Sequence, residues 1–307
     1  MRLILSGIFL CLIAFACKES EVYMFAYFKG NGEDGLHLAV SEDGLQWKAL
    51  KGDSSFLQPQ LSPDKLMRDP CIVQGVDGLF HMVWTISWHE KGIGYASSPD
   101  LIHWSEQILV PVFENTEGVK NCWAPEITYD PIQKEYMIYW ASTIENKFME
   151  TAGPEEGGLN HRLYAVTTKD FKTFSETRLL YDYGFNVIDA AIYFYNGKFI
   201  MFMKDETPNP PQKNICLAYA DRLTGPYSAP SGPIIGNYWA EGPTALHKDE
   251  SWIVYFDKYT EGKYGAVKSD DLRHWNDISN QISFPEGTRH GTVFSVKKSV
   301  VDNISKY

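Results

Sequence analysis

Four acidic residues stand near the start of short apolar segments that recur along the chain. They are Asp69 in RDPCIVQ, Glu126 in APEITYD, Asp189 in IDAAIYF and Glu241 in EGPTALH. A fifth segment, RHGTVFSV, places His290 in the corresponding position. If these segments surround one axis, the carboxyl groups converge, repel one another and raise one another's pKa. Such a costly arrangement indicates a functional site.

Two carboxyl groups can cleave a glycosidic bond when they lie on opposite sides of a bound sugar. One group, protonated, gives its proton to the leaving oxygen, and the other, ionised, activates a water molecule. Inversion of configuration requires the two groups to lie about 6.5–9.5 Å apart. Residues on separate strands across a narrow channel can supply that gap, whereas neighbours on one strand cannot. The chemistry therefore depends on how the fold gathers these segments.

A repeated strand-and-turn pattern predicts the architecture. Each copy alternates apolar and polar residues, turns at Asp or Gly and ends on an aromatic residue, as a half-buried strand does. The copies recur every ~50–70 residues, which is typical of propeller blades with long loops. They span residues 36–47, 93–104, 163–174, 264–275 and, more loosely, 215–227.

Each acidic segment is followed by a second apolar strand, and together they open a blade. Four such pairs are complete, ending in LFHMVWT, EYMIYWA, KFIMFMK and SWIVYFD. The fifth is split, because RHGTVFSV lacks a following strand and YMFAYF at residues 23–28 lacks a preceding one. Joining them predicts an all-β five-bladed propeller whose last blade is closed by N- and C-terminal strands, without free edges. A repeated two-sheet sandwich is the alternative.

The segments also resemble a known family. MRDPCIV, WAPE, IDA, EGP and RHG are similar, in order and spacing, to the successive blade motifs of glycoside hydrolase family 43. The resemblance implies that Asp69 is the general base, that Asp189 tunes the pKa of the acid and orients it, and that Glu241 is the general acid. It also implies inversion at the sugar carbon. A neighbouring family of five-bladed propeller glycosidases remains an alternative.

An acid must hold its proton near neutral pH, so Glu241 is expected in an apolar or anionic neighbourhood. Trp239, two residues earlier, and Asp189, on the preceding blade, are expected to provide it. Glu126 is expected either to bind a sugar hydroxyl or to cap a neighbouring loop.

Aromatic and planar cationic side chains near the acidic segments are candidates for sugar binding. Trp88, Trp123 and Trp239 are expected to offer flat platforms. Arg68 and Arg289 are expected to hold the sugar, neutralise the carboxylates or fix loop backbone. Three further tryptophans end the outer repeats and are expected to be structural: Trp47, Trp104 and Trp275.

His290 is expected to form hydrogen bonds in the channel. The resemblance to family 43 also implies a possible structural calcium ion near this residue, although one histidine is a poor calcium ligand set. No cofactor is expected to be required. Zinc is not expected, because the cysteines after Cys17 lack CxxC spacing and a nearby histidine.

Two long loops, at residues 145–162 and 204–213, are rich in Gly or Pro. They are expected to line the cleft and to decide whether chain ends or chain interiors fit, with surface decoration as the alternative.

The first residues indicate export. A basic start and a short apolar run lead to Ala14-Phe15-Ala16-Cys17, which resembles a bacterial lipoprotein cleavage site. We therefore expect residues 1–17 to be a signal peptide ending at a lipidated Cys17, and residues 18–307 to be the catalytic propeller. The expected location is the outer membrane, by a lipid anchor, facing the periplasm or the cell exterior. An ordinary signal peptide is the alternative.

The formal net charge of −11 disfavours nucleic acid and an anionic membrane surface as partners. The expected partner is an oligosaccharide or polysaccharide, from which terminal arabinofuranosyl, xylosyl or galactosyl residues are removed. A non-catalytic cell-surface carbohydrate-binding propeller is the main alternative. A phosphorylase is disfavoured, because no Arg and Lys cluster is visible near the acidic segments. Oligomeric state is left open.

Overall fold

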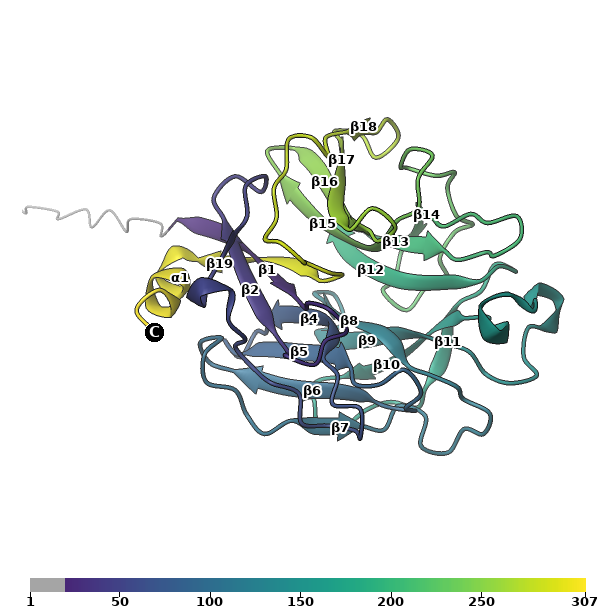
Figure 1. The fold of residues 1–307 in the computed structure, drawn as a ribbon. Coiled ribbons are helices and arrows are strands. Elements are labelled where there is room, and N and C mark those ends of the chain that lie inside the picture. The colour runs from purple at the N-terminus through teal and green to yellow at the C-terminus, as the bar shows by residue number, and fades with distance from the viewer. Residues whose placement is uncertain (1–19) are drawn as a thin grey trace, which may run out of the picture.

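A computed structural model describes residues 20–307 and consists of five antiparallel sheets arranged around a centre (Figure 1). Four sheets have four strands, and one, β12-β13-β14, has three. This confirms the predicted five-bladed propeller. The expected signal peptide, with Cys17, lies outside the described part of the chain.

The strands follow the chain blade by blade. The first two blades are β4 (Arg68–Gln74), β5 (Phe80–Thr85), β6 (Ile93–Ser98) and β7 (Ile108–Val110), then β8 (Trp123–Asp130), β9 (Glu135–Ser142), β10 (Arg162–Thr168) and β11 (Arg178–Tyr181). The next two are β12 (Val187–Tyr195), β13 (Lys198–Asp205) and β14 (Asn214–Ala220), then β15 (Glu241–Lys248), β16 (Ser251–Lys258), β17 (Lys263–Ser269) and β18 (Asn276–Asp277).

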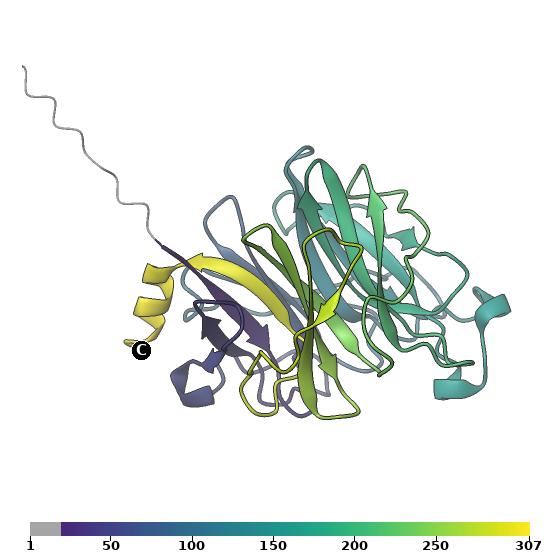
Figure 2. The ribbon, with the colours of Figure 1, turned by 90° about the horizontal axis from the view of Figure 1, so that it is seen from above.

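The fifth blade joins the two ends of the described chain. Its strands are β19 (Thr292–Lys297), β1 (Glu21–Tyr27), β2 (His37–Ser41) and β3 (Lys48–Ala49). β19 and β1 pair antiparallel from Glu21 with Lys297 to Ala26 with Thr292, and they run side by side in Figure 2. The predicted closure of the ring by terminal strands is therefore confirmed, with β19 and β1 as the first two strands of this blade.

Helical structure is short and lies outside the blades. The pieces are η1 (Lys51–Asp53), η2 (Met149–Thr151), η3 (Glu155–Gly158) and α1 (Lys298–Ile304). Over residues 20–307 no helix has the length and apolarity needed to cross a bilayer.

Apolar side chains pack between neighbouring sheets, so each blade buries its apolar residues against the next blade. Trp47 is buried against strands of the fifth and fourth blades, and Trp104 and Trp275 pack on the cores beside their own turns. The structural role expected for these tryptophans is confirmed. Cys71, Cys122 and Cys216 are free and buried within the same packing.

The first strand of four blades carries the same local irregularity. Register shifts interrupt pairing between Arg68 and Cys71, Trp123 and Glu126, Ile188 and Ala191, and Glu241 and Thr244. Each shift contains one residue with positive φ: Asp69 (52°), Ala124 (46°), Asp189 (53°) and Gly242 (60°). Such bulges bend a strand and change the direction of its side chains, at a cost of about 1–3 kcal/mol for each non-glycine residue.

The sequence pattern predicted that the acidic residues occupy equivalent positions around a ring, and the bulges show that they do not. Asp69 and Asp189 occupy the positive-φ position itself, whereas Glu241 precedes it and Glu126 lies two residues after its counterpart, Ala124. The sequence pattern aligned the acids by their order along the strand. The backbone bulge instead gives them different directions, because neighbouring residues of a strand point to opposite sides.

The strand directions decide which loops surround the bulges. Strands alternate in direction within each blade, so the loops between second and third strands open on the face where the first strands begin. The loops after β9 and β13 are of this kind. They contain residues 145–161 and 206–213, the long insertions expected near the cleft.

Candidate active site

A pocket of about 360 Å³ opens where the first strands begin. Every sequence-predicted site residue lines it except Glu126 and Trp239: Arg68, Asp69, Trp88, Trp123, Asp189, Glu241, Arg289 and His290. Residues that are far apart in sequence, on five different blades, therefore share one cavity.

His290 lies between two of the carboxylates. Its Nδ1 is 3.3 Å from Asp69 Oδ1 and 3.8 Å from Asp189 Oδ2. Burial lowers the pKa of His290, but the charges of Asp189 and Asp69 outweigh it and raise the pKa to about 9. The ring is thus an imidazolium at neutral pH that holds two buried carboxylates together.

Asp69 is held as a carboxylate. Its Oδ2 accepts a hydrogen bond from Thr85 Oγ1 at 2.8 Å, and the same hydroxyl oxygen accepts one from Ala124 N on the next blade. Burial raises the pKa of Asp69, but the hydrogen bond and charge of His290, with help from Arg68, lower it to about 2. At any ordinary pH this group is ready to accept a proton.

The pKa of Asp189 is raised, whereas that of Asp69 is lowered. Burial raises its pKa to about 6, although His290 and Lys204 oppose that shift. Its Oδ2 accepts a hydrogen bond from Gly242 N at 3.0 Å. A Cβ on Gly242 would come within 2.4 Å of the His290 ring, so only glycine fits between them. Asp189 consequently fixes the backbone directly after Glu241.

The apolar or anionic environment expected for Glu241 is found only in part. Asp189 acts on it electrostatically, but Glu241 also faces two cations, Lys204 Nζ at 3.2 Å and Arg289 Nη2 at 3.1 Å. Burial raises its pKa, but Lys204, His290 and Arg289 together lower it. In the free protein Glu241 is therefore a carboxylate. Sequence reasoning did not connect Lys204 with Glu241, because Lys204 ends an apolar strand, β13, that is distant along the chain.

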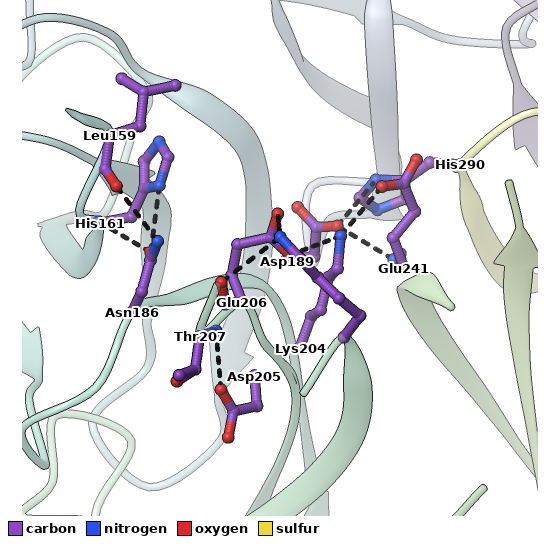
Figure 3. Close-up of polar contacts among 12 residues, drawn as sticks. Leu159, His161, Asn186, Asp189, Lys204, Asp205, Glu206, Thr207, Glu241 and His290 are labelled. Atoms are coloured by element: carbon purple, nitrogen blue, oxygen red, sulfur yellow. Dashed lines mark hydrogen bonds and ion pairs between the residues drawn. The ribbon is translucent and has the colours of Figure 1, made fainter. Parts of the chain in front are cut away.

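Both cations are anchored more closely on other acids. Lys204 Nζ is 2.6 Å from Glu206 Oε2, and Arg289 Nε is 2.6 Å from Asp257 Oδ2. Lys213 Nζ holds the other oxygen of Glu206 at 2.7 Å. Figure 3 shows Lys204 between Glu206 and Glu241. Glu241 thus receives the second, longer contact of each cation.

Glu126, expected to bind a sugar hydroxyl or to cap a loop, does not line this pocket. It is buried, and its Oε1 accepts a hydrogen bond from Thr292 Oγ1 at 2.8 Å. Burial raises its pKa to about 7. This hydrogen bond ties β8, which carries Glu126, to β19, which carries Thr292. Neither a sugar contact nor a loop cap describes this role.

Trp239 is also misplaced by the sequence interpretation. It is 42% exposed, packs its ring at 6.3 Å from that of Tyr259 and is absent from the pocket wall. Trp88 and Trp123 do line the pocket, with their rings edge to face at 5.3 Å. Trp123 Nε1 donates to the Trp88 carbonyl oxygen at 3.1 Å. The two rings therefore form one braced wall.

Arg68 occupies the rim beside Trp88. Its guanidinium lies 4.2 Å from the Trp88 ring and 4.7 Å from the Phe28 ring, and Nη1 donates to Asn31 Oδ1 at 3.0 Å. Arg68, Lys204 and Arg289 together form the cationic cluster that the sequence interpretation failed to find. Since two of them are paired with acids, the pocket has no unbalanced phosphate site.

A calcium ion does not fit the donors around His290. Calcium takes six to eight oxygen ligands, whereas here a charged imidazole already lies between Asp69 and Asp189. Over residues 20–307 no group of three or more His, Cys, Asp or Glu side chains is arranged to hold a metal ion.

Lys204, Glu206 and Thr85 were missed by sequence reasoning. Lysine is almost never fully buried unless it is paired, so a lysine ending the apolar run of β13 was a usable signal. Glu206 follows two residues later on the same loop. Thr85 offered no signal, because a threonine at a strand end is ordinary.

Comparison with known proteins gives a family and a fold. A family model described as a probable glycosyl hydrolase domain matches residues 18–302. Among curated proteins, fructan 6-exohydrolase from Beta vulgaris is 30% identical over 92 residues. That match covers 28% of this chain and 15% of the relative, so this chain matches only a small part of that protein's length.

Solved structures share the propeller at low identity. An α-L-arabinofuranosidase from Lactobacillus brevis has a TM-score of 0.54 at 17% identity, covering 69% of this chain and 72% of that one. A family 43 glycoside hydrolase from Bacillus licheniformis has 0.56 at 18%, covering 77% and 46%. An exo-β-1,3-galactanase from Phanerochaete chrysosporium has 0.55 at 12%, covering 73% and 53%. The likeness to these structures shows the fold alone.

Proposed function

Since the chain belongs to the glycosyl hydrolase family matched over residues 18–302, a family related to glycoside hydrolase family 43, we propose that it removes terminal arabinofuranosyl, xylosyl or galactosyl residues from oligosaccharides with inversion. One observation carries this proposal. Asp69, Asp189 and Glu241 come from three blades and line one pocket that is large enough for a sugar.

In the proposed reaction Asp69 is the general base. Its carboxylate, with a pKa of about 2, accepts a proton from the water that attacks the sugar carbon. Thr85 and His290 hold the group in place, so little reorganisation is needed when the proton arrives. Trp88 and Trp123 form the wall against which the sugar ring rests.

Glu241 is the proposed general acid and Asp189 its positioning partner. Glu241 must take up a proton before it can give one to the leaving oxygen. Its contacts with Lys204 and Arg289 are longer than those that these cations make elsewhere. We propose that an arriving sugar displaces these contacts and that Asp189, with a pKa of about 6, favours protonation by its negative charge.

Amide substitutions test these roles. Asp69→Asn and Glu241→Gln are each expected to lower kcat about 10²–10⁴-fold, because each removes one acid–base group. Activity is measured on aryl arabinofuranosides, xylosides and galactosides, with proton NMR of the first anomer released. Glu106→Gln, at an exposed carboxylate, is the matched control and should retain full activity.

The outcomes separate the alternatives. Turnover surviving in both variants removes the assigned roles, and release of the retained anomer removes inversion. Binding of oligosaccharides without any turnover by the wild-type protein favours the non-catalytic carbohydrate-binding propeller instead.

We also propose export and lipidation at Cys17. The family match begins at residue 18, directly after the cysteine expected to be lipidated, which supports this division of the chain. The mature protein should carry a diacylglycerol on Cys17, seen as a mass increase of its N-terminal peptide. Cys17→Ala should abolish both the mass increase and membrane association. An unmodified mature N-terminus elsewhere contradicts the proposal.

A further inference from the structure

A second pocket, of about 420 Å³, lies on the same face of the propeller as the first. Three loop segments line it: residues 150–154, 184–186 and 207–209. The first and third belong to the loops after β9 and β13. The second leads into β12, the strand that carries Asp189. The mechanism proposed above uses none of these residues.

Two bridges connect the pockets. Glu206 lines the first pocket and Thr207, the next residue, lines the second. Trp123, in the first pocket, packs at 4.9 Å from the His161 ring. The Nδ1 of that ring is 3.2 Å from Asn186 Oδ1, in the wall of the second pocket. Across the view of Figure 3, Glu206 lies between the His161–Asn186 pair and the Lys204–Glu241 pair.

The second pocket is held in shape by a buried arginine. Arg162 Nη2 donates to Thr151 Oγ1 at 2.8 Å, and Nη1 donates to Asn160 Oδ1 at 3.2 Å. Its guanidinium also lies 4.4 Å from the Phe148 ring and pairs with Asp182. Because these bonds already fix the loop, a ligand binds without the entropy cost of ordering it.

Apart from the exposed Glu150, the residues that line the second pocket are uncharged and suit a neutral, hydroxyl-rich ligand. Phe185 packs one side on the core beside Tyr181 and is only partly buried, so its ring contributes an apolar surface to the pocket. Thr207 and Asn209 supply hydroxyl and amide groups. None of the lining residues is Lys, Arg or His, which disfavours a phosphate or another anion.

We propose that this second pocket binds the sugar on the leaving-group side of the cleaved bond. The inference rests on the proposed function, because the general acid must touch the glycosidic oxygen. Glu241 shares Lys204 with Glu206, and the chain passes directly from Glu206 to Thr207 in the second pocket. A leaving group that extends from Glu241 past Glu206 enters that pocket. Substrates with further sugars beyond the cleaved bond are then preferred.

Chain-length dependence of binding tests the inference. The Asp69→Asn variant, which should not turn over, is titrated calorimetrically with arabinose, xylose and galactose and with their trisaccharides. One trisaccharide is expected to bind at least about tenfold more tightly than its monosaccharide. Adding Phe185→Ala or Asn209→Ala should remove most of that gain. Phe194→Ala, at a partly exposed phenylalanine outside both pockets, is the matched control.

Kinetics on the otherwise unchanged enzyme give a second measurement. Phe185→Ala and Asn209→Ala should lower kcat/KM for the trisaccharide about tenfold and leave that for the aryl glycoside within about twofold. Asn209 is exposed, so its variant keeps the test valid if Phe185→Ala fails to fold.

The results distinguish this inference from the proposed function. Equal binding of all mono- and trisaccharides, or a length gain that persists in both variants, overturns the second-pocket inference even when Asp69→Asn has abolished turnover. Turnover that survives Asp69→Asn and Glu241→Gln overturns the proposed function. The tighter binding of the trisaccharide over its monosaccharide is measured by calorimetry and does not depend on turnover.

Discussion

The two sides of the pocket hold their carboxylates differently. The cation in contact with Asp69 is His290, which also lies 3.8 Å from Asp189, and the other oxygen of Asp69 is fixed by Thr85. Glu241 faces two cations, but each is 2.6 Å from another buried acid and more than 3 Å from Glu241.

This difference means that the charge of Asp69 is fixed, whereas the charge of Glu241 can change. Removing the charge on Asp69 would leave His290 with less compensation, so the ionised state is strongly favoured. When Glu241 becomes protonated, Lys204 retains Glu206 and Arg289 retains Asp257 as partners. Protonation of Glu241 therefore leaves no buried cation alone. A base suits the first arrangement and an acid suits the second.

His290→Gln should have the largest effect, because it removes the cation that lies within 4 Å of both Asp69 and Asp189. Leaving buried carboxylates unpaired is expected to cost about 3–5 kcal/mol of unfolding free energy and to abolish turnover. Urea unfolding near neutral pH and kcat/KM measure the two effects. Thr85→Val, which removes the hydroxyl contacts with Asp69 and Ala124 N but no charge, should lower the unfolding free energy and kcat/KM by less. Near-native stability in the His290 variant would contradict the fixed-charge description.

The stability contributed by His290 should depend on pH in a known direction. Its pKa is raised from 6.5 to about 9 by folding, so its contribution is complete below pH 6.5 and lost as pH rises through 9. The difference in urea midpoint between wild type and His290→Gln should be greatest near pH 6, equivalent to about 3 kcal/mol, and small near pH 10. A difference that grows with pH would reverse the assigned charge.

Lys204→Met should move the alkaline limb of the kcat/KM profile to higher pH. Lys204 lowers the pKa of Glu241, so removing its charge raises the pKa of the proposed acid, by about 1–3 units for a contact of this kind. Lys204→Arg keeps the charge and serves as the control. An alkaline limb that does not move shows that Glu241 is not the group titrating there.

Glu206→Gln should give the smallest effect, in the opposite direction. Without its 2.6 Å partner, Lys204 acts more fully on Glu241 and lowers its pKa further. The alkaline limb should move to lower pH by less than about one unit. The same measurement on Glu106→Gln should show no movement. A shift to higher pH would mean that Glu206 does not compete with Glu241 for Lys204.

Most of the fold and much of the pocket could be predicted from the sequence. Period-2 alternation, turn residues and the split first and last strands were sufficient for five blades, because each blade repeats the same local pattern. The motifs also located Asp69, Asp189, Glu241 and His290 at one mouth. Glu126 and Trp239 were wrongly included, since a motif gives the order of residues and not the direction of a bulged strand.

The repeats and motifs were enough to predict the architecture, the family and the residues proposed as acid and base. Only the tertiary structure decided their charge states. Lys204 contacts Glu241 from the third blade and Arg289 contacts it from the segment before β19 of the fifth blade. His290, in that same segment, contacts Asp69 on the first blade. A pKa depends on charges within a few ångströms, and those neighbours are set by how the blades pack around the axis.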